Sequence, residues 1–196
     1  MKVYGDSISG NCHKVKYTAD CLGLSYEWVE VNILERQSRT TEFLAINPAG
    51  QVPAIQLPDG SSLAQSNAII RYLAHGSHLL PADLYAQAKI DEWLFWEQYS
   101  HEPYVAVCRF QKLYLKRQQD ELEPWRVERG NEALDFMDAA LSEQSFLAND
   151  RFSIADIALL AYTRLAHEGG FDLSPRRHVR RWIADCEAQV GLSTSK

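Results

Sequence analysis

The sequence predicts two folded parts, an α/β domain with a mixed four-stranded sheet and then a domain made only of helices. Up to about residue 75, short strand-like runs alternate with segments of helix length, the pattern of a sheet with helices on its faces. After Pro81 the strand signals disappear, and four of the five tryptophans lie beyond this point. We therefore place the α/β domain at 1–75, a linker at 76–84 and the all-helical domain at 85–196.

The elements of the first domain follow from periodicity and from residues that stop helices. A strand at Lys2-Val3-Tyr4 is followed by an amphipathic helix that runs to Leu22 and is stopped by the next glycine. A strand from Tyr26 to Val31 and a short helix from Thr41 to Ile46 come next. Two more strands and a third helix complete the order β-α-β-α-β-β-α, which builds a four-stranded mixed sheet.

The segment from 47 to 69 says most about function. Val52-Pro53 opens a strand over Ala54 to Leu57, and a proline there removes a ladder donor and is able to adopt the cis form, which leaves a backbone edge free. The turn Pro58-Asp59-Gly60 closes a hairpin. Ser66 then stands where a helix N-cap belongs, and helix N-termini attract carboxylates. The segment predicts a site for an extended, peptide-like, acidic ligand.

These motifs, in this order, resemble the glutathione transferase superfamily. The resemblance implies a thioredoxin-like first domain in which Val52-Pro53 pairs with the cysteinyl backbone of glutathione and Gln65-Ser66 holds its γ-glutamyl end. In the helical half, Ser153 and Asp156 have the spacing of a capping box before an apolar run. This motif resembles the capped central helix of transferase C-terminal domains, and the resemblance covers the chain to about Leu192.

The chemistry is expected where the first strand leads into the first helix. A hydroxyl or amide at Ser9 or Asn11 would donate to a sulfur anion held over the helix N-terminus. The resemblance places Ser9 at the activating serine of serine-type transferases. Because Ser-x-Asn also looks like a bacterial disulfide-reductase group of the superfamily, Asn11 shares the candidate role. In the alternative interpretation both residues only cap the helix, and Cys12 is expected to be an inert core thiol.

Further ligand contacts are expected from the loops before the Val52 strand, where amide and guanidinium groups would reach the glycyl carboxylate of glutathione. These candidates are Gln37, Arg39 and Gln51. An electrophilic second substrate is expected on an apolar surface between a loop of the first domain and the early helices of the second, beside a kink at Pro103. The candidates for this pocket are Tyr104, Cys108 and Arg109.

Composition and charge exclude several classes of protein. A net charge of −6 gives no general attraction to nucleic acid or anionic membranes, and the basic run from Arg176 to Arg181 is interpreted as the solvated face of a late helix. No run approaches the roughly 20 apolar residues that span a bilayer, and the N-terminus has no apolar signal segment. The four cysteines show neither metal nor disulfide spacing, so we expect a cytoplasmic protein without a metal.

Three functions remain open from the sequence. The first is a glutathione transferase that conjugates glutathione to small electrophiles in detoxification. The resemblance also implies a homodimer, for which Arg71 and the acidic, aromatic segment 91–97 offer complementary surfaces. The second is a glutathione-dependent disulfide reductase or peroxidase, and the third is a non-catalytic binding module of the same fold. The set of Ser9, Val52-Pro53 and Gln65-Ser66 favours an enzyme over a binding module.

Overall fold

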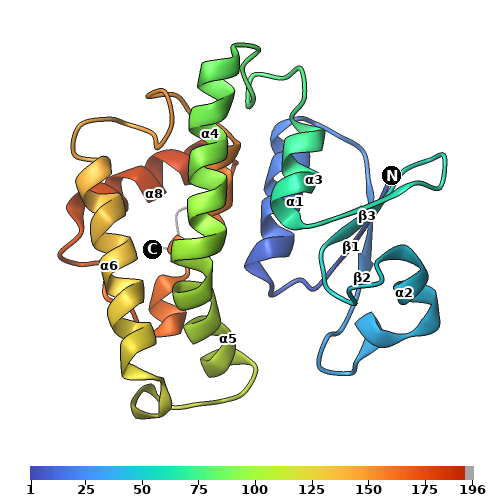
Figure 1. Ribbon diagram of the computed structural model, residues 1–196, viewed down its shortest axis with the longest axis horizontal. Helices are drawn as coiled ribbons and strands as arrows, with labels where there is room; N and C mark the ends of the chain where they lie inside the picture. Colours follow the sequence, from blue (N-terminus) through green and yellow to red (C-terminus); the bar gives the residue numbers. More distant parts are fainter. Residues whose placement is uncertain (193–196) are drawn as a thin grey trace. The chain divides into compact units, whose positions relative to one another are not determined.

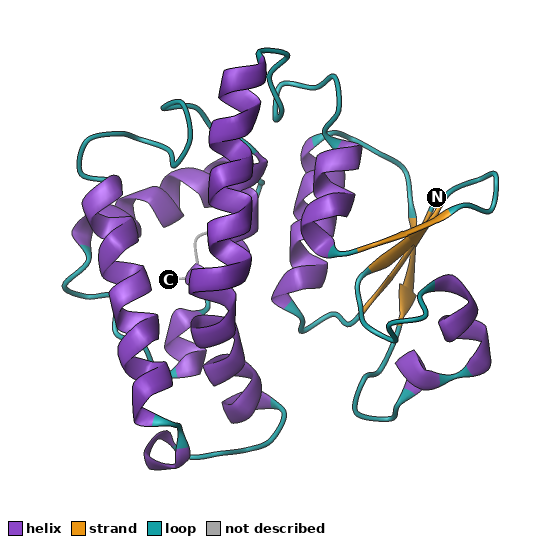
Figure 2. Cartoon of the chain, viewed as in Figure 1, coloured by secondary structure: helices purple, strands orange, loops and turns teal. Residues whose placement is uncertain are grey.

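A computed structural model describes residues 1–192 of the chain, which divides into two compact units, Met1–Ser77 and a second one from His78 onward (Figure 1). The first unit holds all the strands and the second is built of helices (Figure 2). This confirms the predicted fold class, a thioredoxin-like α/β part and an all-helical part. The last four residues of the predicted helical domain, 193–196, lie outside the described residues. No helix within residues 1–192 is long and apolar enough to cross a membrane.

The first unit is built on a mixed sheet with strand order β2-β1-β3-β4. Strand β2 runs parallel to β1, whereas β3 is antiparallel to both β1 and β4. Val3 and Ile55 face each other across β1 and β3 and are completely buried, so the centre of the sheet belongs to the core. The strands are β1 (Lys2–Gly5), β2 (Glu27–Glu30), β3 (Ala54–Gln56) and β4 (Ser62–Ala64).

Helices cover both faces of this sheet. Helices α1 and α3 pack against each other on one face, and α2 lies on the other (Figure 2). Gly23, at φ +62°, follows α1 in the left-handed conformation that glycine adopts without strain, so the predicted stop is confirmed. The helices of this unit are α1 (Gly10–Cys21), the short 3₁₀ turn η1 (Gln37–Arg39), α2 (Thr41–Ile46) and α3 (Ser66–Leu73).

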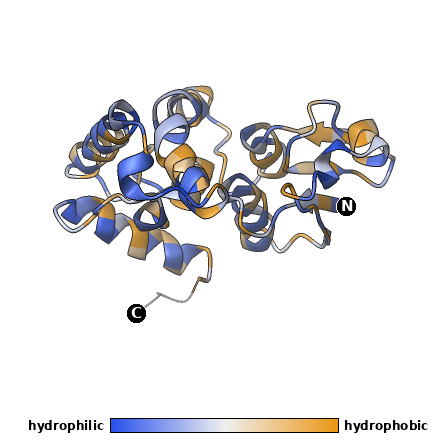
Figure 3. Cartoon of the chain, turned by 90° about the horizontal axis from the view of Figure 1, so that it is seen from below, coloured by the Kyte–Doolittle hydropathy of each residue, from blue (hydrophilic) through white to orange (hydrophobic). Residues whose placement is uncertain are grey.

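The second unit surrounds one buried helix with amphipathic ones. Every residue of α7 is buried, as the apolar run predicts, and the outer helices carry both hydrophilic and hydrophobic residues (Figure 3). Pro103 lies inside the π-helical stretch η2, whose wider turn accommodates the missing N–H of proline. The elements are α4 (Leu84–Trp96), η2 (Glu97–Ala106), α5 (Val107–Leu113), η3 (Gln119–Glu121), α6 (Pro124–Ala140), α7 (Ile154–Thr163), η4 (Ala166–Gly169) and α8 (Arg177–Gln189).

The predicted capping box at the start of α7 is present. Ser153 Oγ accepts a hydrogen bond from the Ala155 amide at 3.2 Å, and Asp156 Oδ2 accepts one from the Ser153 amide at 2.9 Å. Asp156 Oδ1 also accepts from the Leu147 amide and from Trp182 Nε1, both at 2.9 Å. Burial raises the pKa of the Asp156 carboxyl to about 6, although these hydrogen bonds lower it. The carboxyl therefore ties α7 to α8 and has a structural role.

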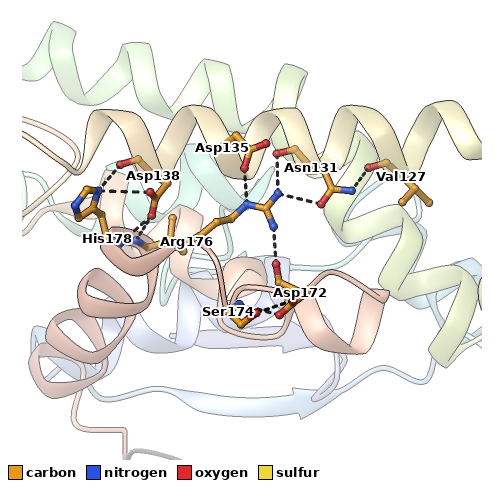
Figure 4. A network of polar contacts seen from close by, with 9 residues as sticks. Val127, Asn131, Asp135, Asp138, Asp172, Ser174, Arg176 and His178 are labelled. Carbon is orange, nitrogen blue, oxygen red and sulfur yellow. Dashed lines mark hydrogen bonds and ion pairs between the residues drawn. The ribbon is translucent and has the colours of Figure 1, made fainter.

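Arg176 corrects the interpretation of the basic run as a solvated face. This residue is buried just before α8, and its guanidinium group binds α6 and the preceding loop (Figure 4). Its Nε donates to Asp135 Oδ1 at 2.7 Å and its Nη2 donates to Asn131 Oδ1 at 3.0 Å, both on α6, while Nη1 donates to the Asp172 carbonyl, four residues earlier in the chain. The two partners on α6 are distant in the sequence, so the run alone gives no sign of them.

Asp138, also on α6, caps α8 from outside that helix. Its Oδ1 accepts hydrogen bonds from the amides of His178 at 2.8 Å and Val179 at 3.0 Å, the first turn of α8 (Figure 4). A carboxylate at this position also interacts favourably with the helix dipole. Together, Asp138 and Arg176 hold the start of α8 on α6.

Candidate functional site

The loop between β1 and α1 places Ser9 at the start of α1. Ser9 is the N-cap residue, with φ −70° and ψ 124°, and its carbonyl accepts from the amides of Cys12 and His13 at 3.1 and 3.0 Å. Its hydroxyl makes no capping hydrogen bond. The alternative interpretation, in which this hydroxyl only caps the helix, is therefore not what the structure shows. The hydroxyl lies half-buried where the N–H groups of α1 create positive potential.

Cys12 lies in the first turn of α1 and is completely buried. Its Sγ accepts from the Asp6 amide at 3.4 Å, and burial raises the pKa of the thiol to about 12, opposed by a hydrogen bond with the Ser9 hydroxyl. The thiol is therefore neutral at physiological pH. Because this hydrogen bond lowers the pKa of the thiol, the Ser9 hydroxyl is its donor and Cys12 Sγ its acceptor.

Asn11 and Ser66 meet, although they lie 55 positions apart. Ser66 Oγ donates to Asn11 Oδ1 at 3.1 Å. One turn further along α1, Lys14 Nζ donates to Asn67 Oδ1 at 3.3 Å. The structure thus brings the candidate thiol-activating region and the candidate γ-glutamyl region together in one unit. The sequence does not predict this contact of Lys14, because the side chain of a lysine on an amphipathic helix is normally solvated.

The start of α3 differs from the prediction by one residue. Gln65, not Ser66, is the N-cap residue, and Ser66 is the first residue of α3. Gln65 has φ +71°, a region that costs energy for a residue with a side chain. Its carbonyl accepts from the Ile69 amide at 2.9 Å and so closes the first turn. The first amides of α3 have no partner within the helix, which makes this end suitable for an anion.

The free backbone edge is smaller than the sequence suggested. Strand β3 is paired on both sides, and its ladders begin at Ala54. Val52 lies before the ladders, and the Val52–Pro53 peptide bond is cis. The loop that carries Val52 is braced by Asn47 Nδ2, which donates to the Gln51 carbonyl at 2.7 Å, and by Arg39 Nη1, which donates to the Ala49 carbonyl at 3.0 Å. Within this segment, the backbone next to the paired part of β3 is that of Val52 and Pro53.

The loop candidates have different surroundings. The side chain of Gln37 is engaged within its own loop, where Oε1 accepts from the Asn32 amide at 2.8 Å and Nε2 donates to Glu35 at 3.4 Å. Arg39 braces the next loop, as described above. Gln51 is exposed and directly precedes Val52, so it is the loop candidate with a side chain nearest to the Val52 backbone along the chain.

The candidates for a second-substrate pocket separate into one surface residue and two interior ones. Tyr104 lines a surface cavity of about 430 Å³ together with Trp96, Tyr99 and Phe136. Cys108 belongs to the hydrophobic core of the helical unit, and burial raises its pKa to about 11. Arg109 is buried and its Nε donates to Glu168 at 2.5 Å. Cys108 and Arg109 both lie on the buried side of α5.

The described part of the chain shows no cluster of metal ligands. Among residues 1–192, no group of three or more histidine, cysteine, aspartate or glutamate side chains is arranged to hold an ion. What the arrangement offers is hydrogen-bond donors, two helix N-termini and an unpaired stretch of backbone. Groups of these kinds are suited to binding an anionic peptide-like molecule and to stabilising a sulfur anion.

Comparisons with known proteins agree with this arrangement. A family model described as the N-terminal domain of glutathione S-transferase matches residues 8–75, and one described as its C-terminal domain matches residues 95–189. The chain is 34% identical over 195 residues to glutathione S-transferase 3 of Zea mays, an alignment that covers 93% of this chain and 86% of that protein.

Solved structures give the same picture. A crystal structure of a glutathione S-transferase from Pseudomonas fluorescens is 46% identical, has a TM-score of 0.92, and matches over 95% of this chain and 94% of its own. Ure2p in complex with glutathione has a TM-score of 0.87 over 96% of this chain and 90% of its own. At 20% identity, the second likeness shows the fold alone.

Proposed function

The chain belongs to the glutathione S-transferase family, and from this premise we propose that it conjugates reduced glutathione to small electrophiles through a thiolate bound beside Ser9. The observation that carries the proposal is the hydrogen bond from Ser66 to Asn11, which joins the first turns of α3 and α1. Two helix N-termini are thereby held at one place. A ligand with a carboxylate at one end and an ionisable thiol near its middle suits such a place.

Glutathione is proposed to bind as an extended tripeptide. Its γ-glutamyl carboxylate accepts from the first amides of α3 and, once the Ser66 hydroxyl turns its one proton from Asn11 to the ligand, from that hydroxyl as well, while Gln65 holds the amino end. Its cysteinyl backbone pairs with Val52 beside the cis-linked Pro53. The glycyl carboxylate lies toward Gln51, with Arg39 and Gln37 in the neighbouring loop. Ure2p, a fold relative, binds glutathione, which supports this assignment.

The chemistry needs no protein nucleophile, because glutathione brings its own sulfur. The Ser9 hydroxyl turns its proton from Cys12 to that sulfur, with Asn11 in support, and the dipole of α1 favours the anion. The thiol proton leaves to solvent. The thiolate then attacks the electrophilic carbon, a C–S bond forms, and the leaving group departs with its electron pair. We also propose that the chain belongs to the bacterial-type serine or Ser/Asn subgroup of the family, a proposal that the Ser-x-Asn sequence supports.

Three further features belong to the proposal. The second substrate is a small apolar electrophile, with Tyr104 as the candidate contact that remains on a surface. All four cysteines are free, which suits a protein that works in the reducing cytoplasm in detoxification. The boundaries of the two domains, 1–75 and 85–196 with a linker between them, are kept as predicted.

Calorimetry with reduced glutathione tests the proposal directly. We expect saturable binding at millimolar ligand or below, and turnover of an activated aryl halide that depends on glutathione. S-methylglutathione, which has no ionisable thiol, serves as the matched ligand that binds without supporting turnover. Absence of heat and of turnover at millimolar glutathione, with a folded protein by circular dichroism, would remove the transferase function.

A further inference from the structure

A cavity of about 240 Å³ lies in the first unit, between α1 and the edge strand β2. Its walls are three aromatic rings, the side chain of a lysine and the loop before α1. The lining residues are Ser7, His13, Lys16, Tyr26 and Trp28, and none of them is a proposed contact of glutathione. The volume is below the range of cavities that hold drug-sized ligands, so the cavity suits a small molecule.

Two of the aromatic rings are held in place by contacts with their neighbours. A Cβ atom at Gly5 would lie 2.5 Å from the Trp28 ring, so the indole packs directly on the glycine backbone. His13 Nε2 donates to the Ser7 carbonyl at 2.9 Å, and the His13 ring stacks on Tyr17. Because these rings are already oriented, a ligand that binds against them has to order little of the protein.

The cavity carries a negative charge from Glu30. This carboxylate accepts from Trp28 Nε1 at 2.7 Å and from the Ser7 amide at 2.9 Å. These donors are neutral, and within residues 1–192 no cationic side chain pairs with Glu30. Lys16 pairs with Asp20 at 2.8 Å, so these two charges offset each other. With histidine neutral, the balance at the cavity is therefore negative.

Aromatic rings beside an uncompensated carboxylate favour an organic cation. The face of an indole ring attracts a cation, and the alkyl groups of a substituted ammonium ion contact the ring with apolar surface. An anion would be repelled by Glu30. We propose that this cavity binds a small alkylated ammonium ion, with its alkyl groups against Trp28 and with Glu30 as the counter-charge. The inference does not depend on the proposed function, because it requires neither glutathione nor an electrophile.

The test compares choline with dimethylbutanol, the neutral alcohol in which a carbon atom replaces the ammonium nitrogen of choline. Trp28 is the only tryptophan before residue 78, so its indole N–H signal in proton–nitrogen NMR spectra reports on this cavity. The signal is identified by its absence from the spectrum of Trp28→Phe. At about pH 8, where histidine side chains are largely neutral, choline should shift this signal saturably and leave the other indole signals in place. We expect choline to bind at least about fivefold more tightly than the alcohol.

Glu30→Gln separates the charge from the shape of the cavity. Glutamine keeps an oxygen acceptor for the indole N–H but has no charge, so choline should bind several-fold more weakly while the affinity for the alcohol stays the same. Glu27→Gln is the matched control, because Glu27 lies on the opposite face of β2 and pairs with Lys2. It should change neither affinity.

Two results would overturn the proposal. The first is an equal affinity of the unsubstituted protein for choline and for the alcohol, or no shift of the Trp28 signal at high millimolar choline. The second is an unchanged choline affinity in folded Glu30→Gln. The first comparison needs no variant, so it decides the matter even if Glu30→Gln does not fold.

Discussion

Ser9 and Cys12 lie one helical turn apart at the proposed sulfur site, and their surroundings give them different roles. The thiol is buried, and its pKa is raised to about 12. The hydroxyl is half-buried and is not used for capping. A buried neutral thiol is a poor nucleophile, whereas a hydroxyl with a proton to donate stabilises an anion that another molecule brings. The proposed chemistry therefore depends on the Ser9 hydroxyl and not on the Cys12 thiol.

Ser9→Ala should lower turnover more than it lowers affinity for glutathione. Loss of one preorganised donor costs about 2.7–4 kcal/mol in well-studied oxyanion sites, and a soft sulfur anion should give the lower end or less. Asn11→Ala should have a smaller effect. The ultraviolet absorbance of the bound thiolate should titrate at higher pH in Ser9→Ala, and Cys12→Ser is the control that stays active. An inactive Cys12→Ser beside an unaffected Ser9→Ala would assign the chemistry to the protein thiol.

Ser66→Ala should weaken glutathione binding without unfolding the protein. Removal of a hydrogen bond to a charged group costs roughly 1.5–3 kcal/mol, or about 10- to 150-fold in affinity. Ser62→Ala, in the exposed strand β4, is a control of the same chemistry. Because Ser66 donates to Asn11, the double variant with Asn11→Ala should show non-additive losses. Unchanged affinity in folded Ser66→Ala would place the carboxylate elsewhere.

At the scale of elements, the sequence predicts those helix ends that are determined by neighbouring residues. Gly23 stops α1, and Ser153 with Asp156 starts α7, because turn and cap chemistry act over a few residues. The start of α3 was misplaced by one residue, since a positive φ at Gln65 is imposed by its surroundings and has no signature such as glycine. The burial of Arg176 has no local signature for a similar reason, because its side-chain partner Asp135 lies 41 residues away on α6.

Asp156→Ala should destabilise the fold more than it affects chemistry. The substitution removes a cap worth about 0.5–2 kcal/mol and leaves the buried donors of Leu147 and Trp182 without this acceptor, at about 1–3 kcal/mol for each. Chemical denaturation should show a loss of about 2 kcal/mol or more. Asp185→Ala, at an exposed pair on α8, should change little. Unchanged unfolding with collapsed turnover would move Asp156 into the active site.

Asp156→Asn tests the charge of the same group. Burial raises the folded-state pKa to about 6 from an ordinary value of 3.8, so the folded protein binds more protons than the unfolded chain between these values. The contribution of this group to unfolding free energy is therefore greatest at low pH and falls, by up to about 3 kcal/mol, as pH rises from about 4 to 6. This fall should be missing from Asp156→Asn in urea titrations across that range. An identical pH dependence in both proteins would contradict the assignment.

At the scale of the whole molecule, we expect a two-fold homodimer. Phe95, Tyr99 and Phe136 are exposed to 76%, 83% and 53% on the helical unit, and clustered apolar exposure of this kind marks an interface between proteins. Light scattering at micromolar concentration should give twice the mass of one chain, and Tyr99→Glu should reduce it to a single chain. A stable single-chain species for the unsubstituted protein would contradict the dimer.

In the helical unit, the sequence pattern predicts which side chains share a helix face but not what that face contacts. The sequence groups Tyr104, Cys108 and Arg109 because they flank Pro103, yet Tyr104 lines a surface cavity whereas Cys108 and Arg109 are buried. A stripe repeating every three or four residues indicates which side chains lie on one face, but not whether that face meets the core or a ligand. The packing of Cys108 against Val105 and Leu134 decides this, and such contacts appear only in three dimensions.

The raised pKa values of the cysteine thiols bear on the proposed reaction with electrophiles. In that reaction, each electrophile comes close to the polypeptide. An ionised cysteine would compete with glutathione for it and would itself be alkylated. Burial raises the pKa of Cys12, Cys21, Cys108 and Cys186 alike, so these sulfurs stay protonated at neutral pH, where thiols react slowly. Prolonged turnover should therefore leave the protein unmodified in intact mass spectra. In the proposed reaction, the ionised sulfur belongs to glutathione, and it leaves the protein with the product.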